Sequence, residues 1–175
     1  MKVVLEPYDG QWAGHPEIVY FISRFPDYVN GAKLVIKQRL GLDPPNTTVR
    51  VKLVDGLGSI PMLEPTGSAR GDTIHISSNA IVNSFMGYTH VKKVLAHELV
   101  HVYMNHYGRT RYTFAPTWKR EGIALWTSGQ TDLKDFVKVP PKHRNNRWMS
   151  YLTYYTRFRQ HTQDNGMDAV LAGML

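Results

Sequence analysis

The 175-residue chain contains no cysteine. Disulfide bonds and thiolate metal ligands are therefore excluded, and a bound metal ion would have to be held by nitrogen and oxygen donors. No run of apolar residues approaches the roughly 20 residues that a membrane-spanning helix requires. The apolar stretch within residues 1–10 is also far too short for a secretory signal. We expect a cytoplasmic protein if Met1 is the native start, and a secreted or periplasmic protein if a leader has been removed.

The chain also has few acidic residues. It contains 14 Asp and Glu and 21 Lys and Arg, which gives a net charge of +7. A positive surface can attract acidic peptides or nucleic acid, but charge alone mainly reports on solubility. We favour an ordinary basic surface, and nucleic acid is not the favoured partner. The length and the 42% apolar content predict one globular domain over residues 1–175. No pattern specifies an oligomeric state.

The most informative stretch reads His97-Glu98-Leu-Val-His101, inside a helical pattern that begins near Thr89 and stops at Gly108. Histidines four residues apart on a helix have Cβ atoms about 6 Å apart, so both imidazoles can reach one cation. Glu98 is turned about 100° around the helix and can hold a bound water without joining the ligands. Polar groups on a buried helix need a partner such as a metal ion. The surrounding apolar residues predict that this helix is buried: Val91, Val94, Leu95, Leu99, Val100 and Val102.

A catalytic zinc ion usually takes three protein ligands and leaves one position for water. The better candidate for the third ligand is Glu121, which lies in the first turns of a predicted helix. This helix has Thr117 as its N-cap and ends at Gly129. His106 is the weaker alternative, because it lies nine residues after His97 near the end of the first helix.

These two motifs, His97-Glu98-x-x-His101 and Trp118-x-x-Glu121-Gly122-x-Ala124, resemble the gluzincin metallopeptidases, particularly the small peptidase-MA-like domains. A weaker similarity extends the match to residues 72–175. The resemblance implies a zincin-like fold in which His97, His101 and Glu121 bind one Zn²⁺ per chain and Glu98 is the general base. It also implies a peptide or protein substrate, cleaved by an endopeptidase or an aminopeptidase. Leu125 stands where the thermolysin type has an aspartate that orients the first histidine, which disfavours that subfamily.

In the predicted mechanism zinc lowers the pKa of its bound water to about 7, and Glu98 transfers the proton to the leaving amine. Tyr151 is the preferred hydrogen-bond donor to the oxyanion, with His143 as the alternative. Two other classes stay open: a latent or non-catalytic zinc-binding domain, and a DNA-associated metalloprotease or regulator. Steeply salt-dependent DNA binding would identify the last.

The remaining patterns predict an α+β class, with a helix and a small sheet in residues 1–88 and metal-binding helices in residues 89–175. Alternating apolar residues predict strands over Thr48–Val54 and Thr73–Ser77. In the families that the chain resembles, the second strand forms the sheet edge to which an extended substrate adds. Residues 70–72 spell Arg-Gly-Asp, which we interpret as a turn.

The other helices are predicted from apolar periodicity and end signals. The first covers residues 16–40, is interrupted near Pro26 and closes at Gly41. Its predicted core stripe comprises Val19, Ile22, Phe25, Val29, Leu34, Val35 and Leu40. A short helix follows from Ser78 to about Met86. Residues 129–147 read as a loop over the cleft, with a possible short helix at its start, and residues 148–161 as an aromatic-rich helix. A last helix is capped by Asp164 or Asn165.

Overall fold

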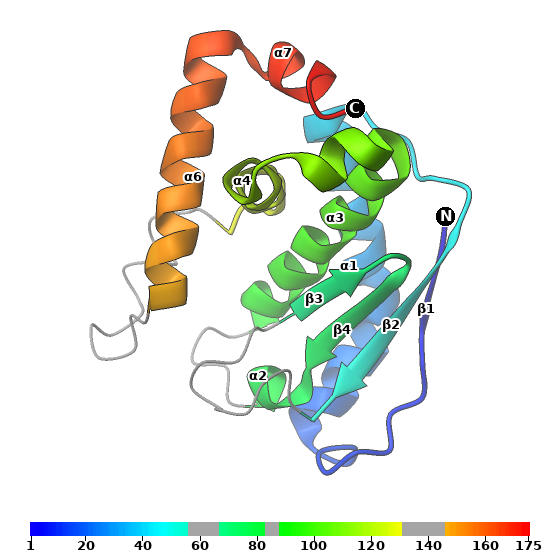
Figure 1. Cartoon of the computed structure of the whole chain (residues 1–175). Helices are drawn as coiled ribbons and strands as arrows, with labels where there is room; N and C mark the ends of the chain where they lie inside the picture. Colours follow the sequence, from blue (N-terminus) through cyan, green and yellow to red (C-terminus); the bar gives the residue numbers. More distant parts are fainter. Residues whose placement is uncertain (56–66, 83–87, 131–145) are drawn as a thin grey trace.

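The computed structural model describes residues 1–55, 67–82, 88–130 and 146–175. Its described part joins a four-stranded sheet to a larger set of helices, which confirms the predicted α+β class (Figure 1). The elements, in chain order, are β1 (Lys2–Leu5), α1 (Pro16–Leu40), β2 (Thr48–Val54), β3 (Gly67–Arg70), β4 (Thr73–Ser77), α2 (Ser78–Val82), α3 (Tyr88–Phe114), α4 (Thr117–Ser128), α6 (Asn146–Asn165) and α7 (Met167–Ala172).

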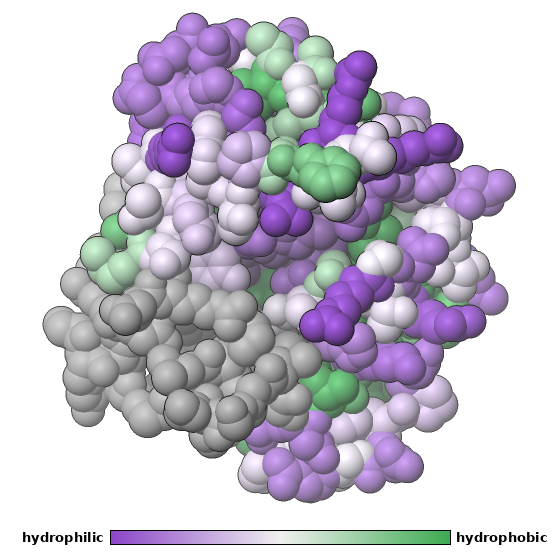
Figure 2. Space-filling model, in the orientation of Figure 1, coloured by the Kyte–Doolittle hydropathy of each residue, from purple (hydrophilic) through white to green (hydrophobic). Residues whose placement is uncertain are grey.

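The sheet has the strand order β1-β2-β4-β3. β2 alternates as predicted, because Val49 and Val51 are fully buried whereas Arg50 is exposed. β1 was not predicted; it pairs in parallel with β2, with Lys2 opposite Thr48. Helices α1 and α3 lie on the apolar face of the sheet, and the opposite face carries mainly hydrophilic residues (Figures 1 and 2). The hydrophobic core therefore fills the space between the sheet and these two helices, and it continues to buried residues of α4, α6 and α7.

The expectation that Thr73–Ser77 forms the sheet edge is wrong. β4 lies inside the sheet, parallel to β2 on one side and antiparallel to β3 on the other. The edge strand is β3, which pairs Gly67 with Ile76, and residues 71–72 form the predicted turn, with Gly71 at φ 56°. The segment Gly-Ser-Ala-Arg has neither apolar alternation nor β-branched residues, so its own sequence does not identify it as a strand.

Helix α1 is continuous from Pro16 to Leu40, so the predicted interruption near Pro26 is wrong. It ends as predicted at Gly41, which adopts a left-handed conformation. The predicted core stripe is only partly correct, since Val19, Ile22 and Leu34 are exposed. The buried face instead comprises Ile18, Phe21, Phe25, Tyr28, Val29, Ala32, Ile36 and Leu40. This face packs against the sheet and α3, and that packing maintains the helix through a proline that cannot donate its backbone hydrogen bond.

Helix α3 contains the predicted metal-binding stretch and breaks where the prediction ended it. Arg109, directly after Gly108, has φ 41° and ψ −120°, and helical structure then resumes to Phe114. The apolar residues predicted to be buried along α3 are all buried.

The predicted helix caps are wrong in two places. Pro116, and not Thr117, is the N-cap of α4, without a side-chain capping bond. Gly166, and not Asp164 or Asn165, precedes α7, because α6 continues to Asn165. The end of α4 at Gly129 agrees with the prediction.

Two further predictions fall wholly or partly outside the described residues. The predicted helix after Ser78 is seen as α2 up to Val82, and its continuation toward Met86 lies in residues 83–87. Most of the predicted loop over residues 129–147 lies in residues 131–145. Among the helices that the structure describes, none is long and apolar enough to cross a membrane.

Candidate metal centre

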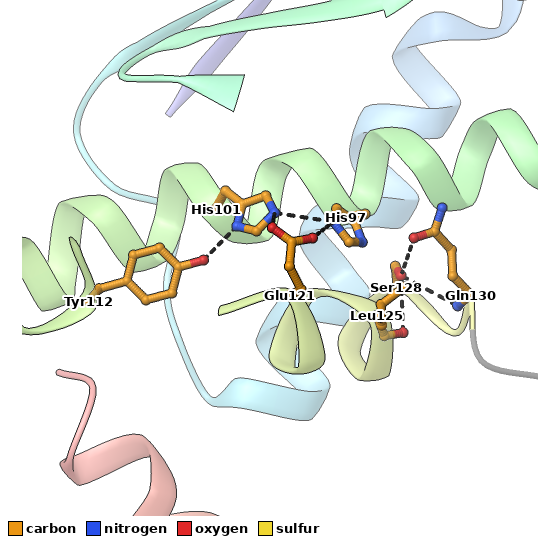
Figure 3. Close-up of polar contacts among 7 residues, drawn as sticks. All are labelled: His97, His101, Tyr112, Glu121, Leu125, Ser128 and Gln130. Carbon is orange, nitrogen blue, oxygen red and sulfur yellow. Dashed lines mark hydrogen bonds and ion pairs between the residues drawn. The ribbon is translucent and has the colours of Figure 1, made fainter. Parts of the chain in front are cut away.

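His97 and His101 project from one turn of α3 toward the same point (Figure 3). Their Nε2 atoms lie 3.1 Å apart, and their ring centroids are 4.9 Å apart. His97 is 5% exposed, and the residues before and after the pair on the helix belong to the core. The four-residue spacing and the burial of α3 are therefore sufficient to bring two imidazole nitrogens together away from bulk water.

Glu121 brings a carboxylate to the same point from α4. Its Oε2 atom lies 3.3 Å from Nε2 of His97, and its Oε1 atom lies 3.7 Å from Nε2 of His101. Helix α4 is held in place at its C-terminal end by Arg39 of α1, which donates to the carbonyl oxygen of Trp126 and lies over its ring. Sequence reasoning placed these three residues in one set, and the structure brings them together.

The spacing of the three donors suits a small divalent cation. Two facing imidazole nitrogens at 3.1 Å cannot both carry a proton, whereas unprotonated nitrogens can share a cation with the nearby carboxylate. Donors bound at about 2.1 Å in a tetrahedral arrangement would lie about 3.4 Å apart, close to the observed 3.1, 3.3 and 3.7 Å. His97, His101 and Glu121 could therefore hold a metal ion.

The charges within this cluster favour the metal-binding forms of Glu121 and His101, and they favour the protonated form of His97. Burial opposes ionisation of Glu121, but the hydrogen bond with His97 and the nearby positive charges lower its pKa to about 2. Burial, together with the charge of His97, lowers the pKa of His101 to about 3. Burial also lowers the pKa of His97, yet interactions with Glu121 and Glu98 outweigh it and raise that pKa overall. An anionic carboxylate and a neutral imidazole are the forms that bind metal ions, so His97 must lose its proton when an ion binds.

Glu98 lies beside the cluster, buried between α3 and the first residue of β3. It is 6% exposed. A Cβ atom on Gly67 would lie 3.0 Å from its Oε1 atom and 2.9 Å from Cγ1 of Val94. The glycine at the start of the edge strand thus allows the backbone to pass close to the carboxylate.

Tyr151 lies on the α6 side of the cluster, with its ring centroid 6.3 Å from that of His97 in an edge-to-face arrangement. Its position depends on close packing of α6 against α4, where Gly122 faces the buried ring of Phe158. The alternative oxyanion donor, His143, lies outside the described residues. His106, the alternative third ligand, is exposed and packs against Tyr107, so the structure does not bring it to the cluster.

Nδ1 of His97 lacks the aspartate partner of the thermolysin pattern, because residue 125 is a leucine. No hydrogen bond to this buried atom is found within the described part of the chain. The side chain of Gln130 approaches closely enough to contribute to raising the pKa of His97, without hydrogen-bonding geometry to Nδ1 (Figure 3). Leu125 offers only its backbone carbonyl, which accepts from Ser128.

Sequence reasoning missed Tyr112, whose hydroxyl oxygen lies 2.5 Å from Nδ1 of His101 (Figure 3). Burial and the charge of Glu121 raise the pKa of this phenol, so it stays protonated. No local motif marks Tyr112, because it lies beyond the predicted end of the helix.

A comparison with protein families agrees with this arrangement. Residues 37–172, more than half of the chain, match the family model described as "Peptidase of plants and bacteria". The chain belongs to this peptidase family. The matched range contains α3, α4 and α6, and therefore the three proposed ligands with Glu98, Tyr112 and Tyr151. No curated protein and no solved structure matches the chain significantly.

Membership of this family identifies the protein as a peptidase with protein or peptide substrates. The His97–His101–Glu121 cluster adds a group that could bind a metal ion.

Proposed function

We propose that this peptidase is a zinc-dependent metallopeptidase of the gluzincin type, built on one domain over residues 1–175. The observation that carries the proposal is the convergence of two imidazole nitrogens and one carboxylate, with separations of 3.1 to 3.7 Å. Two histidines and one glutamate form a ligand set that suits zinc and leaves one coordination position open. Membership of a peptidase family supports hydrolysis over a purely structural metal site.

His97, His101 and Glu121 would hold the ion. A zinc ion held there would supply Lewis-acid polarisation of the scissile carbonyl and make a water molecule easier to deprotonate. Glu98 accepts the proton of the attacking water and returns it to the leaving amine. Its burial beside Gly67 restricts the carboxylate, which follows the ligand His97 directly in the chain.

Tyr151 donates a hydrogen bond to the oxyanion in this proposal. The ring lies on the α6 side of His97, while Glu98 faces the strand β3. The proton acceptor and the oxyanion donor thus come from different elements around the metal ligands. Such a separation allows a peptide carbonyl to be attacked on one side and stabilised on the other.

The test is metal content by mass spectrometry, combined with hydrolysis of a mixed peptide library by wild-type protein and Glu98→Gln. We expect about one zinc ion per chain in both proteins, and a loss of turnover of at least about 100-fold in the variant, since general-base catalysis contributes about 10²–10⁴-fold. Glu17→Gln, in the first turn of α1, is the matched control and should retain full turnover.

Undiminished hydrolysis by Glu98→Gln would exclude Glu98 as the general base. Zinc binding without hydrolysis of any peptide would instead favour the latent or non-catalytic domain. Wild-type protein that binds no divalent metal would overturn the proposal as a whole.

A further inference from the structure

Tyr112 contacts a proposed metal ligand at the ring nitrogen that faces away from the other donors. Its hydroxyl lies 2.5 Å from Nδ1 of His101, while Nε2 of the same ring faces His97 and Glu121 (Figure 3). Tyr112 is 1% exposed, so the phenol cannot exchange this contact for bulk water without local opening. The arrangement leaves Nε2 directed at the metal position and Nδ1 directed at the phenol.

The contact exists only because α3 breaks before Tyr112. Residues eleven apart on an uninterrupted helix are separated by about 16 Å along its axis, too far for a histidine and a tyrosine to touch. Arg109, with φ 41° and ψ −120°, changes the direction of the chain, so that the next helical segment turns back toward His101. The break thus places the phenol beside a residue from the preceding segment.

Gly108 allows the chain to pack closely at this break. A Cβ atom there would lie 2.8 Å from Cβ of Tyr112 and would collide with the backbone carbonyl of Met174. Met174 and Tyr112 therefore both pack closely against Gly108. These contacts fix the position of the tyrosine independently of its hydrogen bond to His101.

The chemistry of imidazole gives this contact a defined role. A histidine that binds a metal through Nε2 carries its proton on Nδ1, and that N–H commonly donates to an oxygen acceptor that fixes the ring. We propose that Tyr112 is a positioning residue that accepts this hydrogen bond and holds His101 in the tautomer and orientation required for metal binding. The inference rests on the proposed function, because it needs a metal ion at this cluster.

The two histidines differ in this respect. His101 has a phenol partner at Nδ1, whereas Nδ1 of His97 has no hydrogen bond to any residue that the structure describes. Loss of the phenol should therefore release the better-anchored ligand of the pair.

The experiment compares the dissociation constant for Zn²⁺ of wild type, Tyr112→Phe and Tyr103→Phe, by competition with a chromophoric chelator. Tyr103 is the matched control, because it lies on the same helix, is fully buried, and has a hydroxyl without a hydrogen-bond partner in the described ranges. We expect about 10- to 100-fold weaker binding for Tyr112→Phe, the usual effect of losing such a partner, and less than a twofold change for Tyr103→Phe.

A second readout needs no variant. In zinc-loaded, ¹⁵N-histidine-labelled wild type, the imidazole of His101 should bind zinc through Nε2 and carry its proton on Nδ1. Zinc on Nδ1 of His101, or equal zinc affinity of Tyr112→Phe and wild type, would overturn the inference while leaving the metal site intact. Absence of zinc binding by wild type would instead overturn the proposed function, so the two failures are distinguishable.

Discussion

Replacing Gly122 with alanine tests whether the close packing of α4 and α6 positions Tyr151. A methyl group at residue 122 would lie 2.6 Å from Cγ and 3.0 Å from Cδ2 of Phe158, which is fully buried. Overpacking of this kind costs about 1–3 kcal/mol. Alanine also favours the helix by about 1 kcal/mol over glycine. The free energy of unfolding should therefore fall by about 0–2 kcal/mol.

The substitution should also affect turnover. Tyr151 lies seven residues, or two helical turns, before Phe158, so both side chains lie on the same side of α6. A displaced α6 would move Tyr151 away from His97, while the three proposed ligands on α3 and α4 keep their places. Peptide turnover should fall by about 10-fold or more, with unchanged zinc content.

The assay combines chemical denaturation with steady-state kinetics, and Gly31→Ala is the matched control. Gly31 is also inside a helix, but a Cβ atom there meets only the flexible end of Lys92, at 3.3 Å, so this variant should gain up to about 1 kcal/mol. Adding Phe158→Leu to Gly122→Ala should recover part of the loss, with a coupling energy of about 0.5–3 kcal/mol. Stabilisation of Gly122→Ala equal to that of the control would refute the packing argument.

Two other predictions concern the base and the ligands. Gly67→Ala should displace Glu98, because its methyl group would lie 3.0 Å from Oε1; we expect a 10- to 100-fold lower kcat with unchanged zinc affinity. An unaltered kcat would mean that Glu98 is not held by the strand. Zinc affinity should fall as the pH is lowered. Burial lowers the pKa of His97, but Glu121 and Glu98 raise it by more, and a protonated imidazole cannot bind zinc. Zinc titrations between about pH 8 and about pH 5 measure this loss, and a flat profile would contradict it.

Local patterns predicted the parts of the candidate site that one helix contains. His97 and His101 share a face because of the helical period, and the apolar residues around them indicated burial, which the structure confirms. Glu121 reaches the two histidines only because a second helix packs against the first. The motif around Glu121 was specific enough to predict it as the third ligand. The assignment of these residues to catalysis and metal binding stays a prediction.

The features that the sequence did not predict depend on contacts between distant segments. Tyr112 reaches His101 only through the backbone conformation of Arg109, which is unusual for a non-glycine residue and has no sequence signal. β1 and β3 are four residues long and acquire their strand structure from their neighbours in the sheet. Pro26 was expected to interrupt its helix, but the buried face of α1 outweighs one missing backbone hydrogen bond.

The order of the elements along the chain also has a consequence for folding. His97 and Glu121 belong to consecutive helices joined by a short turn, whereas the sheet must pair Lys2 with Thr48 across the whole of α1. Closing the longer loop costs more chain entropy and delays native contacts. The α3–α4 contact therefore closes at a lower cost in chain entropy than the β1–β2 pairing, and an ion bound there would stabilise this contact further.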